Sequence, residues 1–595
     1  MSTTIEKGDI EKQELRKQQL AQAEELLFAE SHPESFAKQL YHGYFAQQMV
    51  FPYPRLAAAE SESVAAALDE LRRVCDQYLD AEHIDRNADI PAELIHHLGR
   101  IGLLGMTAPE SAGGRGFSQL AYCQLLEELG SRCSSTSIFV NAHHSIGMRG
   151  LLLFGNEQQK QRWLPDLVSG KAIAAFALTE VQAGSDAANV QTTATPAADG
   201  SHYVLNGSKR YITNGAIANL LTVMARTPIE GSEKTAVTAF LVTPDMPGFQ
   251  VVEPRMEKLG IRGTATAKLE FENMRVPAEN VLGREGKGLR VALTVLDFGR
   301  TTFGACCSGA ARSCLQLATR HARTRIQFGQ PIGAFELVQK KLARMAADLY
   351  AMQAMTHMTA GLIDRGSDDY MLETAILKVW TTERLWKIVN ETFQIYGGAA
   401  YFTDQPLERM LRDARINQIG EGANEVLTSF IGLVGMRDPG ERLRRVAQSL
   451  HAPWKSLGVI GQFVVQEFGR LLGRPKITTR SDSLGDHARW LSKAVKRFGL
   501  SVQRELIRHR EEILDRQLVH ERIACAAMEL YASTAVIARM DHELQTAASE
   551  TVRHSHQAAR LFLRQSRRRF EHAMAGNRNN DDVQIREVAE SLSAG

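Results

Sequence analysis

The stretch Asn417-Gln418-Ile419-Gly420-Glu421-Gly422-Ala423-Asn424-Glu425-Val426 places one carboxylate between two glycines, directly after the basic segment Leu407 to Ile416. Glycines on both sides allow the backbone to bend and to approach a ligand closely. A single carboxyl group beside the apolar residues Ile419 and Val426 is a candidate for proton abstraction. On the local sequence alone, a helix N-cap or a turn acid is the alternative interpretation.

Three groups of segments resemble the acyl-CoA dehydrogenases and occur in the order of that family. The Glu421 stretch and the segments before it resemble the C-terminal active-site block, carried here as Gln394-Ile395-Tyr396-Gly397-Gly398-Ala399-Ala400-Tyr401 and Leu407-Glu408-Arg409-Met410-Leu411-Arg412-Asp413. Three segments of this chain resemble the flavin-contacting strands of the family: Phe176-Ala177-Leu178-Thr179-Glu180, Ala183-Gly184-Ser185-Asp186 and Asn206-Gly207-Ser208-Lys209-Arg210-Tyr211-Ile212-Thr213-Asn214-Gly215. Two further stretches resemble the family segment that reaches the FAD of a neighbouring subunit: Arg323-Thr324-Arg325-Ile326-Gln327-Phe328-Gly329-Gln330 and Leu337-Val338-Gln339.

Further segments narrow the resemblance to one branch. Glu34-Ser35-Phe36-Ala37, Val50-Phe51-Pro52-Tyr53-Pro54 and Ala142-His143-His144-Ser145-Ile146-Gly147 are similar to the very-long-chain acyl-CoA dehydrogenases. A helical tail beyond residue 435 also matches that branch, whose chains are longer than those of the other types. The likeness therefore covers nearly the whole chain and becomes weaker in the tail.

Length and composition predict an ordinary globular protein. The 595 residues are 44% hydrophobic, which is enough for three or four domains with substantial cores. The net charge of +2 gives no strong field of one sign, so the composition argues against nucleic acid as a partner. Seven cysteines show no spacing typical of a metal site or of a secreted disulfide framework, so no metal is expected.

The first residues of the sequence predict the cellular location of the protein. Met1 to Lys7 include early acids and lack both the apolar core of a secretory signal and the character of a transit segment. These features favour a cytoplasmic, bacterial protein.

The hydrophobic pattern predicts a mostly α-helical protein with an inserted β domain. In one central region, short β-rich runs alternate with turn signals, and on both sides of it apolar residues recur at helical spacing. The expected parts are an N-terminal strap (1–60), an N-terminal helical domain (61–172), a β-barrel-like middle domain (173–283), a four-helix bundle with the base (284–436) and an additional helical domain (437–595).

Two local signals predict breaks in regular structure. Leu205-Asn206-Gly207-Ser208 is typical of a β-hairpin turn, because Asn-Gly tolerates positive φ. Pro439-Gly440 predicts a boundary after the helix bundle.

The tail carries an apolar stripe from Val459 to Leu472, followed by Lys476 and Arg480. This pattern is typical of a helix that lies in a membrane interface, and a dimer or interdomain core would show the same stripe. The resemblance implies tail-mediated membrane association, so peripheral membrane contact through residues 459–472 is one expectation. No apolar run is long enough to predict a membrane-spanning helix.

The resemblance implies the role of each residue near the thioester. Glu421 would be the base, and its backbone N–H together with a flavin hydroxyl would polarise the thioester carbonyl. In some relatives the base comes instead from the position of Gly299, which has no side chain to abstract a proton. The substrate would be contacted by Ser185, Asp297 on the CoA side, Arg300 near the thioester, and Gly422.

The resemblance also implies an FAD site shared by two chains. Thr179 and Thr213 would bond the edge of the isoalloxazine ring, and Ser185 would contact both cofactor and thioester arm. Arg325 would bind the pyrophosphate of the neighbouring subunit's FAD, since a guanidinium pairs well with phosphate. Further cofactor contacts would be Phe176, Leu178, Tyr211, Phe328, Gln339, Gln394, Gly397, Gly398, Ala423 and Asn424. A homodimer is therefore the expected minimal unit.

Three residues depart from the family pattern. Tyr211 stands where tryptophan is usual, Ala423 replaces threonine, and Gly420 replaces a bulkier residue. Since Gly420 removes bulk beside the substrate pocket, we expect long or bulky acyl chains to be accepted.

The expected function is FAD-dependent α,β-dehydrogenation of long or very-long-chain fatty acyl-CoA to trans-2-enoyl-CoA, the first step of fatty acid β-oxidation. Electrons would pass to an electron-transfer flavoprotein. One alternative is an acyl-CoA oxidase that gives electrons to oxygen. Another is a scaffold with weak turnover that keeps the fold for complex assembly.

Overall fold

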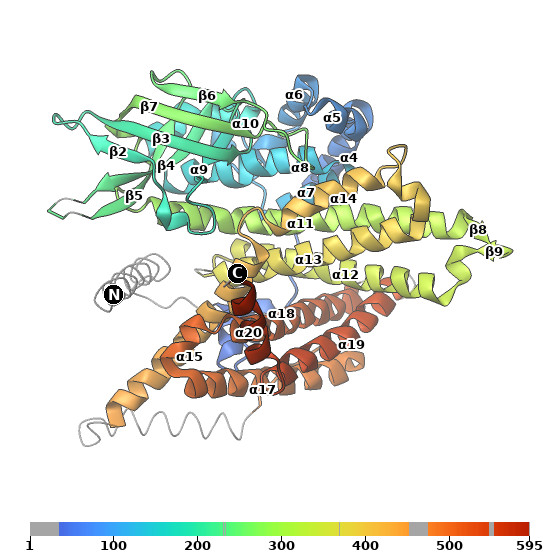
Figure 1. The fold of residues 1–595 in the computed structure, drawn as a ribbon. Helices are drawn as coiled ribbons and strands as arrows, with labels where there is room; N and C mark the ends of the chain where they lie inside the picture. The colour runs from blue at the N-terminus through green and yellow to red at the C-terminus, as the bar shows by residue number, and fades with distance from the viewer. Residues whose placement is uncertain are drawn as a thin grey trace. The chain divides into compact units, whose positions relative to one another are not determined.

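The computed structural model describes residues 35–593 apart from 230, 233, 368, 451–473 and 547–551. The described chain forms two compact units. Unit 1 contains residues 69–117 and 135–299, and unit 2 contains residues 35–68, 118–134 and 300–593. The predicted fold class, helical domains with an inserted β domain, is confirmed (Figure 1). The stripe at 459–472 lies outside the described residues, so membrane contact there stays a prediction.

Unit 1 is built around one curled sheet. Its strands are β1 (Ala174–Ala177), β2 (Thr193–Pro196), β3 (His202–Ile212), β4 (Leu220–Pro228), β5 (Thr235–Val242), β6 (Phe249–Glu253) and β7 (Ala267–Pro277). The order is β1-β4-β2-β3-β7-β6, and β5 also pairs with β4. β1 and β4 run parallel, whereas β3 pairs antiparallel with both β2 and β7.

Both faces of the central strands are buried, as alternation along β4 shows. Leu220 and Met224 face one hydrophobic cluster, which also receives residues from the covering helices α9 and α10. Leu221 and Val223 face a second cluster formed within the sheet. Figure 1 shows α9 and α10 beside the sheet. The helices of this part are α5 (Ala81–Asn87), α6 (Ala92–Arg100), α8 (Ser134–Val140), α9 (Arg149–Phe154) and α10 (Glu157–Ser169).

A π-helical turn, η3 (Asn141–Gly147), contains the histidine pair noted in the sequence. His143 Nδ1 accepts a hydrogen bond from the Ala174 N–H at 2.9 Å, so its Nε2 donates to the Leu167 carbonyl at 3.1 Å. Burial lowers the pKa of His143 to about 4, which keeps the ring neutral. The ring therefore fixes the start of β1 to the adjoining helices.

The predicted hairpin at Asn206-Gly207 is wrong. β3 continues through both residues, and its register against β7 shifts between Leu205 and Gly207. Gly207 has φ 149°, and a Cβ there would lie 2.6 Å from Thr192 Oγ1. Close approach of Thr192, the residue before β2, thus requires the glycine, and the turn signal is overridden by pairing along the whole strand.

Unit 2 is helical. Its elements include α2 (Phe36–Tyr41), α3 (Gln47–Val50), α7 (Gln119–Arg132), α12 (Glu336–Asp364), α13 (Met371–Tyr396), α14 (Leu407–Arg415), α15 (Asn424–Leu450), α17 (Gly485–His509), α18 (Gln517–Thr546), α19 (Arg553–Gly576) and α20 (Asp582–Ser593). A small ribbon of β8 (Ile326–Gln327) and β9 (Gln330–Pro331) precedes α12. α4 (Ala58–Tyr78) and α11 (Gly288–Thr324) each contribute residues to both units.

The predicted break at Pro439-Gly440 is also wrong. α15 continues through Pro439 to Leu450. Proline removes one backbone N–H from a helix, which normally weakens the turn. Here Arg437 Nε donates to Glu441 Oε1 at 2.8 Å across that turn, and Met436 is buried just before it. Packing and the ion pair therefore keep the helix continuous.

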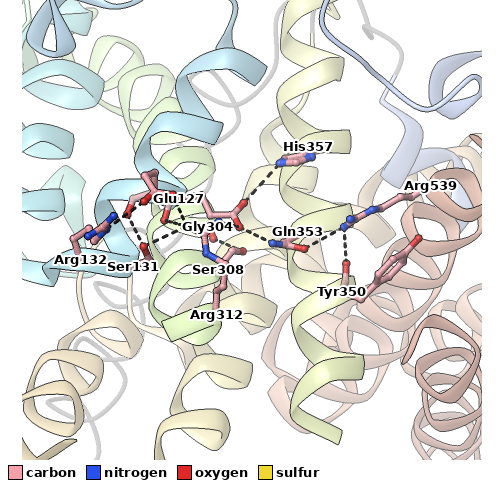
Figure 2. A network of polar contacts seen from close by, with 11 residues as sticks. Glu127, Ser131, Arg132, Gly304, Ser308, Arg312, Tyr350, Gln353, His357 and Arg539 are labelled. Carbon is pink, nitrogen blue, oxygen red and sulfur yellow. Dashed lines mark hydrogen bonds and ion pairs between the residues drawn. The ribbon is translucent and has the colours of Figure 1, made fainter. Parts of the chain in front are cut away.

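A buried polar network connects α7, α11, α12 and α18 (Figure 2). Glu127 Oε1 accepts from Gln353 Nε2 at 2.5 Å, and Arg539 donates to Gln353 Oε1 at 3.3 Å. Burial alone would raise the pKa of Glu127, but His357 and Arg312 hold it below its ordinary value. The carboxylate thus stays ionised and links the helix bundle to the C-terminal helices.

The described C-terminal helices pack together around α18. By length and composition α18 could cross a membrane, so the expectation that no apolar run is long enough is wrong. However, 89% of its apolar window is buried inside the protein. Glu529 of α18 lies 3.2 Å from Arg384 of α13 and 2.7 Å from Arg569 of α19. The apolar character of α18 is therefore explained by contacts with its neighbouring helices.

The start of α2 is attached to α13 by a buried carboxyl group. Glu373 Oε1 accepts from Ser35 Oγ at 2.8 Å and from the Ala37 N–H at 2.9 Å. Burial, together with the neighbouring charge of Asp369, raises the pKa of Glu373 to about 7. Glu373 Oε2 has no hydrogen-bond partner in the described part of the chain.

We expect Glu373→Gln to change the pH dependence of stability. The folded protein holds the Glu373 proton to higher pH than the unfolded chain, so stability is lost as pH rises from 4.5 through about 7. The loss is on the order of 3 kcal/mol. In thermal unfolding, the variant should have a higher melting temperature than the wild type at pH 8, and the two proteins should have the same melting temperature at acidic pH. The same difference in melting temperature between variant and wild type at both pH values would contradict a raised pKa of Glu373.

Candidate active site

Glu421 lies in the base loop, residues 419–423, between η8 (Ile416–Gln418) and α15. Glu421 has φ 56° and Gly422 has φ 102°. The left-handed conformation costs a non-glycine residue about 1 kcal/mol, so surrounding contacts must hold it. The side chains of Ile419 and Val426 are 52% and 44% exposed, so the apolar surroundings predicted for Glu421 are open to solvent in the single chain.

Two cations hold the carbonyl groups of the base loop. Arg300 Nε donates to the Glu421 carbonyl at 3.4 Å. Lys378 Nζ donates to the Gly422 carbonyl at 2.6 Å and to Asn424 Oδ1 at 2.9 Å. Both cations are buried, so neither peptide group depends on solvent for its orientation.

Polar side chains of α13 extend this support. Asn424 Nδ2 donates to Thr382 Oγ1 at 3.0 Å and to Glu383 Oε1 at 2.8 Å. Gln418 Nε2 donates to the same oxygen of Glu383 at 2.8 Å. Asn424 was predicted as a cofactor contact, which stays a prediction, and its observed bonds join the start of α15 to α13.

The sequence analysis missed Lys378, Thr382 and Glu383. A signal for Lys378 was available, because this lysine interrupts the apolar run Ala375 to Trp380. A charge inside such a run indicates a buried ion with specific partners. Thr382 and Glu383 carry no comparable signal.

Two of the three segments of unit 1 predicted to contact flavin, residues 176–180 and 206–215, lie side by side. The Arg210 N–H donates to the Thr179 carbonyl at 2.9 Å, just before Tyr211 and Thr213. Lys209 Nζ donates to the Leu178 carbonyl at 3.1 Å. The structure therefore brings together the ends of β1 and β3, as the placement of both segments at one flavin edge requires.

A buried ion pair holds these strand ends. Lys209 is 0% exposed, and its Nζ lies 2.6 Å from Glu180 Oε1. The same oxygen accepts from Thr192 Oγ1 at 2.6 Å. Burial raises the pKa of Glu180, but Lys209 and Thr192 bring it below its ordinary value, so the carboxylate is charged at neutral pH.

The predicted flavin residues of unit 1 differ in exposure. The Tyr211 side chain is 57% exposed with φ 61°, and Ser185 is exposed beside Gly184, where a Cβ would meet nothing within 4 Å. Leu178 is part of the hydrophobic core, with Phe176 packed against it. Tyr211 and Ser185 are thus accessible to a ligand, whereas Leu178 and Phe176 support the strand.

The substrate residues next to Gly299 are divided between the two units. Asp297 is buried in unit 1, and Arg300 is buried in unit 2 where it contacts the base loop. Gly422 faces Leu427, whose side chain would lie 3.1 Å from a Cβ at that glycine. Ala423 is half-buried directly before α15.

The remaining predicted residues form what we call the helix-end surface of unit 2: Arg325, Phe328, Gln339, Gln394, Gly397 and Gly398. His321 stacks on Tyr396 with ring centroids 4.0 Å apart, and Lys341 forms an ion pair with Glu391. These contacts bring together the end of α11, the start of α12 and the end of α13. All six residues of this surface are exposed in the single chain.

The residues present fit FAD. Exposed hydroxyl and aromatic groups at Ser185 and Tyr211 suit the flavin ring, and the guanidinium of Arg325 suits a pyrophosphate. Gly397, with φ 61°, and Gly398 leave open space where a Cβ would meet nothing within 4 Å. Backbone at these glycines can therefore approach a bulky ligand.

Comparison with known families covers most of the chain. Residues 61–171, 175–274 and 286–434 match the N-terminal, middle and C-terminal domains of acyl-CoA dehydrogenase. Residues 482–594 match the ACAD9/ACADV C-terminal domain.

Individual relatives agree with these matches. The mitochondrial very long-chain specific acyl-CoA dehydrogenase of Homo sapiens is 35% identical over 525 residues, which cover 87% of this chain and 80% of that protein. The probable acyl-CoA dehydrogenase FadE10 of Mycobacterium tuberculosis is 33% identical over 581 residues, with 93% and 87% covered. A crystal structure of an acyl-CoA dehydrogenase complexed with FAD from Bacillus anthracis superposes with a TM-score of 0.78 at 28% identity, covering 95% of each chain.

The fold and these matches define the class: a flavin-dependent oxidoreductase that acts on acyl-CoA. The chain belongs to the acyl-CoA dehydrogenase family, in the very-long-chain-like branch with the additional C-terminal helical domain. The resemblance stated from the sequence is confirmed.

Proposed function

We propose that this acyl-CoA dehydrogenase oxidises long and very-long-chain fatty acyl-CoA to trans-2-enoyl-CoA and passes the electrons to an electron-transfer flavoprotein. The observation that carries the proposal is the base loop, where Glu421 sits in a left-handed turn whose carbonyls are held by Arg300 and Lys378. A carboxylate in such a rigid setting is suited to take a proton from a bound substrate.

The reaction divides between the protein and its cofactor. Glu421 would accept the proton from the α-carbon, and its backbone N–H would donate to the thioester carbonyl, which makes the α-proton more acidic. Bound FAD would accept the hydride from the β-carbon. Thr179 and Thr213 would bind the ring edge, and Arg325 the pyrophosphate of the neighbouring chain's cofactor. Asp297 and Ser185 would orient the CoA arm.

We also propose a homodimer, because residues of the helix-end surface would complete the FAD site of a second chain. The helix-end surface exposes Arg325, Gln394 and two adjacent glycines, yet these residues suit a phosphate-rich ligand. If that ligand is the FAD of a second chain, one cofactor site requires residues from two protomers. The exposed ring of Phe328, 92% accessible in the single chain, would then be covered.

Gly420 favours long substrates. A Cβ at this position would meet only the Ile416 carbonyl, at 3.6 Å, and Gly420 does not have positive φ. We expect Gly420→Phe to lower kcat/KM for palmitoyl-CoA about tenfold or more and to leave butyryl-CoA nearly unaffected, because the added ring occupies space needed by a long chain. Steady-state kinetics across chain lengths check this result.

Gly420→Ala is the matched control and should keep the wild-type chain-length profile. Equal losses for palmitoyl-CoA and butyryl-CoA in Gly420→Phe would contradict a role in chain-length selection.

The function itself is tested by anaerobic titration of the purified yellow protein with saturated acyl-CoAs of graded length. Loss of flavin colour with palmitoyl-CoA and longer thioesters, followed by reoxidation with electron-transfer flavoprotein, supports the proposal. Rapid reoxidation by oxygen with peroxide formation would instead identify an oxidase. Absence of bleaching at every chain length would indicate the scaffold alternative.

A further inference from the structure

Lys378 is a buried cation close to the reactive loop. It lies in α13 with 0% of its side chain exposed. A buried ammonium is stable only where hydrogen-bond acceptors replace water. Its ammonium donates to the Gly422 carbonyl at 2.6 Å and to Asn424 Oδ1 at 2.9 Å, and both acceptors belong to the segment that follows Glu421.

The bonds of Lys378 and Arg300 act on successive peptide groups. Arg300 binds the carbonyl of Glu421, and Lys378 binds the carbonyl of Gly422. Both residues have positive φ, so their backbone lies outside the helical conformation of the neighbouring η8 and α15. The two cations thus hold the two peptide groups that directly follow the Cα of Glu421, from which its side chain leaves the backbone.

Several charged or titratable groups face the Lys378 ammonium. Burial lowers the pKa of Lys378 to about 8, the charge of Glu421 opposes that shift, Arg300 adds to it, and Cys307 and Glu383 oppose it. Glu421 comes from the base loop, Arg300 and Cys307 from α11, and Glu383 from α13 itself. Lys378 is therefore protonated at neutral pH and loses its charge in mildly alkaline solution.

We propose that Lys378 is a positioning residue for proton abstraction. Its ammonium group orients the base loop through the Gly422 carbonyl and Asn424, so that Glu421 presents its carboxylate to the substrate, and it does not itself touch the substrate. This inference rests on the proposed role of Glu421 as the base.

The test is Lys378→Met in the FAD-loaded protein, which keeps the length of the side chain but removes the charge and the donors. We expect the rate of flavin reduction by palmitoyl-CoA at pH 7 to fall about 100-fold, the loss typical of a small displacement of a reacting group. The dissociation constant of the unreactive product 2-hexadecenoyl-CoA and the FAD content should stay near wild type. Lys493→Met, at an exposed lysine of α17, is the control and should behave as wild type.

The pH profile separates positioning from a general structural role. Wild-type flavin reduction should decline as pH rises through about 8, where Lys378 loses its charge, and this decline should be absent in Lys378→Met. Wild-type rates in Lys378→Met would overturn the inference. The inference would also be overturned if Lys378→Met lost rate, FAD content and melting temperature together while its pH profile stayed like that of the wild type. If the variant does not fold, a wild-type profile that stays flat through this range would overturn it.

Glu421→Gln, measured in parallel, distinguishes the two proposals. If Glu421→Gln is inactive while Lys378→Met reacts at the wild-type rate, only the positioning role fails. If Glu421→Gln reduces flavin normally, the assignment of the base fails.

Discussion

Replacing Glu421 with glutamine is expected to slow flavin reduction by palmitoyl-CoA about 10⁴-fold, the upper range for loss of a general base. Glutamine keeps the size and hydrogen-bonding atoms of the side chain but cannot accept the α-proton. The base loop should keep its conformation, because Arg300 and Lys378 bind backbone carbonyls that the substitution leaves in place. Stopped-flow absorbance of the flavin under anaerobic conditions measures the rate.

Glu425→Gln provides the control, since Glu425 is an exposed carboxylate four residues further along in α15. It should reduce flavin at the wild-type rate. FAD content and product affinity should be similar in Glu421→Gln and the wild type, so that the loss is confined to the chemical step. A Glu421→Gln protein that bleaches at a rate within about tenfold of wild type would show that another group removes the proton.

The second large effect is expected from Lys209→Met. The substitution leaves the Glu180 carboxylate buried without its cation, which typically costs about 3–5 kcal/mol. It also removes the bond from Lys209 to the Leu178 carbonyl, which holds the predicted flavin segments together. We expect a lower melting temperature and loss of FAD during purification, measured as the ratio of flavin absorbance to protein absorbance.

The double variant Lys209→Met with Glu180→Gln distinguishes charge burial from packing. Glutamine can keep a hydrogen bond with Thr192 and carries no charge, so most of the lost stability should return. A double variant as unstable as Lys209→Met would contradict the ion-pair account. Full FAD retention in Lys209→Met would show that the strand ends do not need this lysine.

Local signals predicted the turn at the base correctly. The glycines on either side of Glu421 indicated a bend, and Gly422 indeed has φ 102°. Gly397 at the end of α13 likewise has positive φ, 61°. These features depend on residues adjacent in the chain, which is why sequence patterns can report them.

Features that depend on packing between distant segments were missed. Lys378 contacts a carbonyl 44 residues later in the chain, and no local pattern specifies which loop a buried lysine will reach. Asn206-Gly207 has the composition of a turn, yet pairing of β3 with β2 and β7 keeps it extended. Pro439 has the composition of a helix end, yet the surrounding contacts of α15 carry the helix past it. In each case tertiary contacts outweighed a local preference.

The most direct test of the account is anaerobic rapid mixing of the FAD-loaded protein with palmitoyl-CoA that carries deuterium at the α-carbon. If Glu421 removes the α-proton during oxidation, the flavin should bleach, deuterium should slow the bleaching, and trans-2-hexadecenoyl-CoA should form in an amount equal to the flavin reduced. A protein that leaves the flavin oxidised, or that bleaches without forming the enoyl product, would contradict the account.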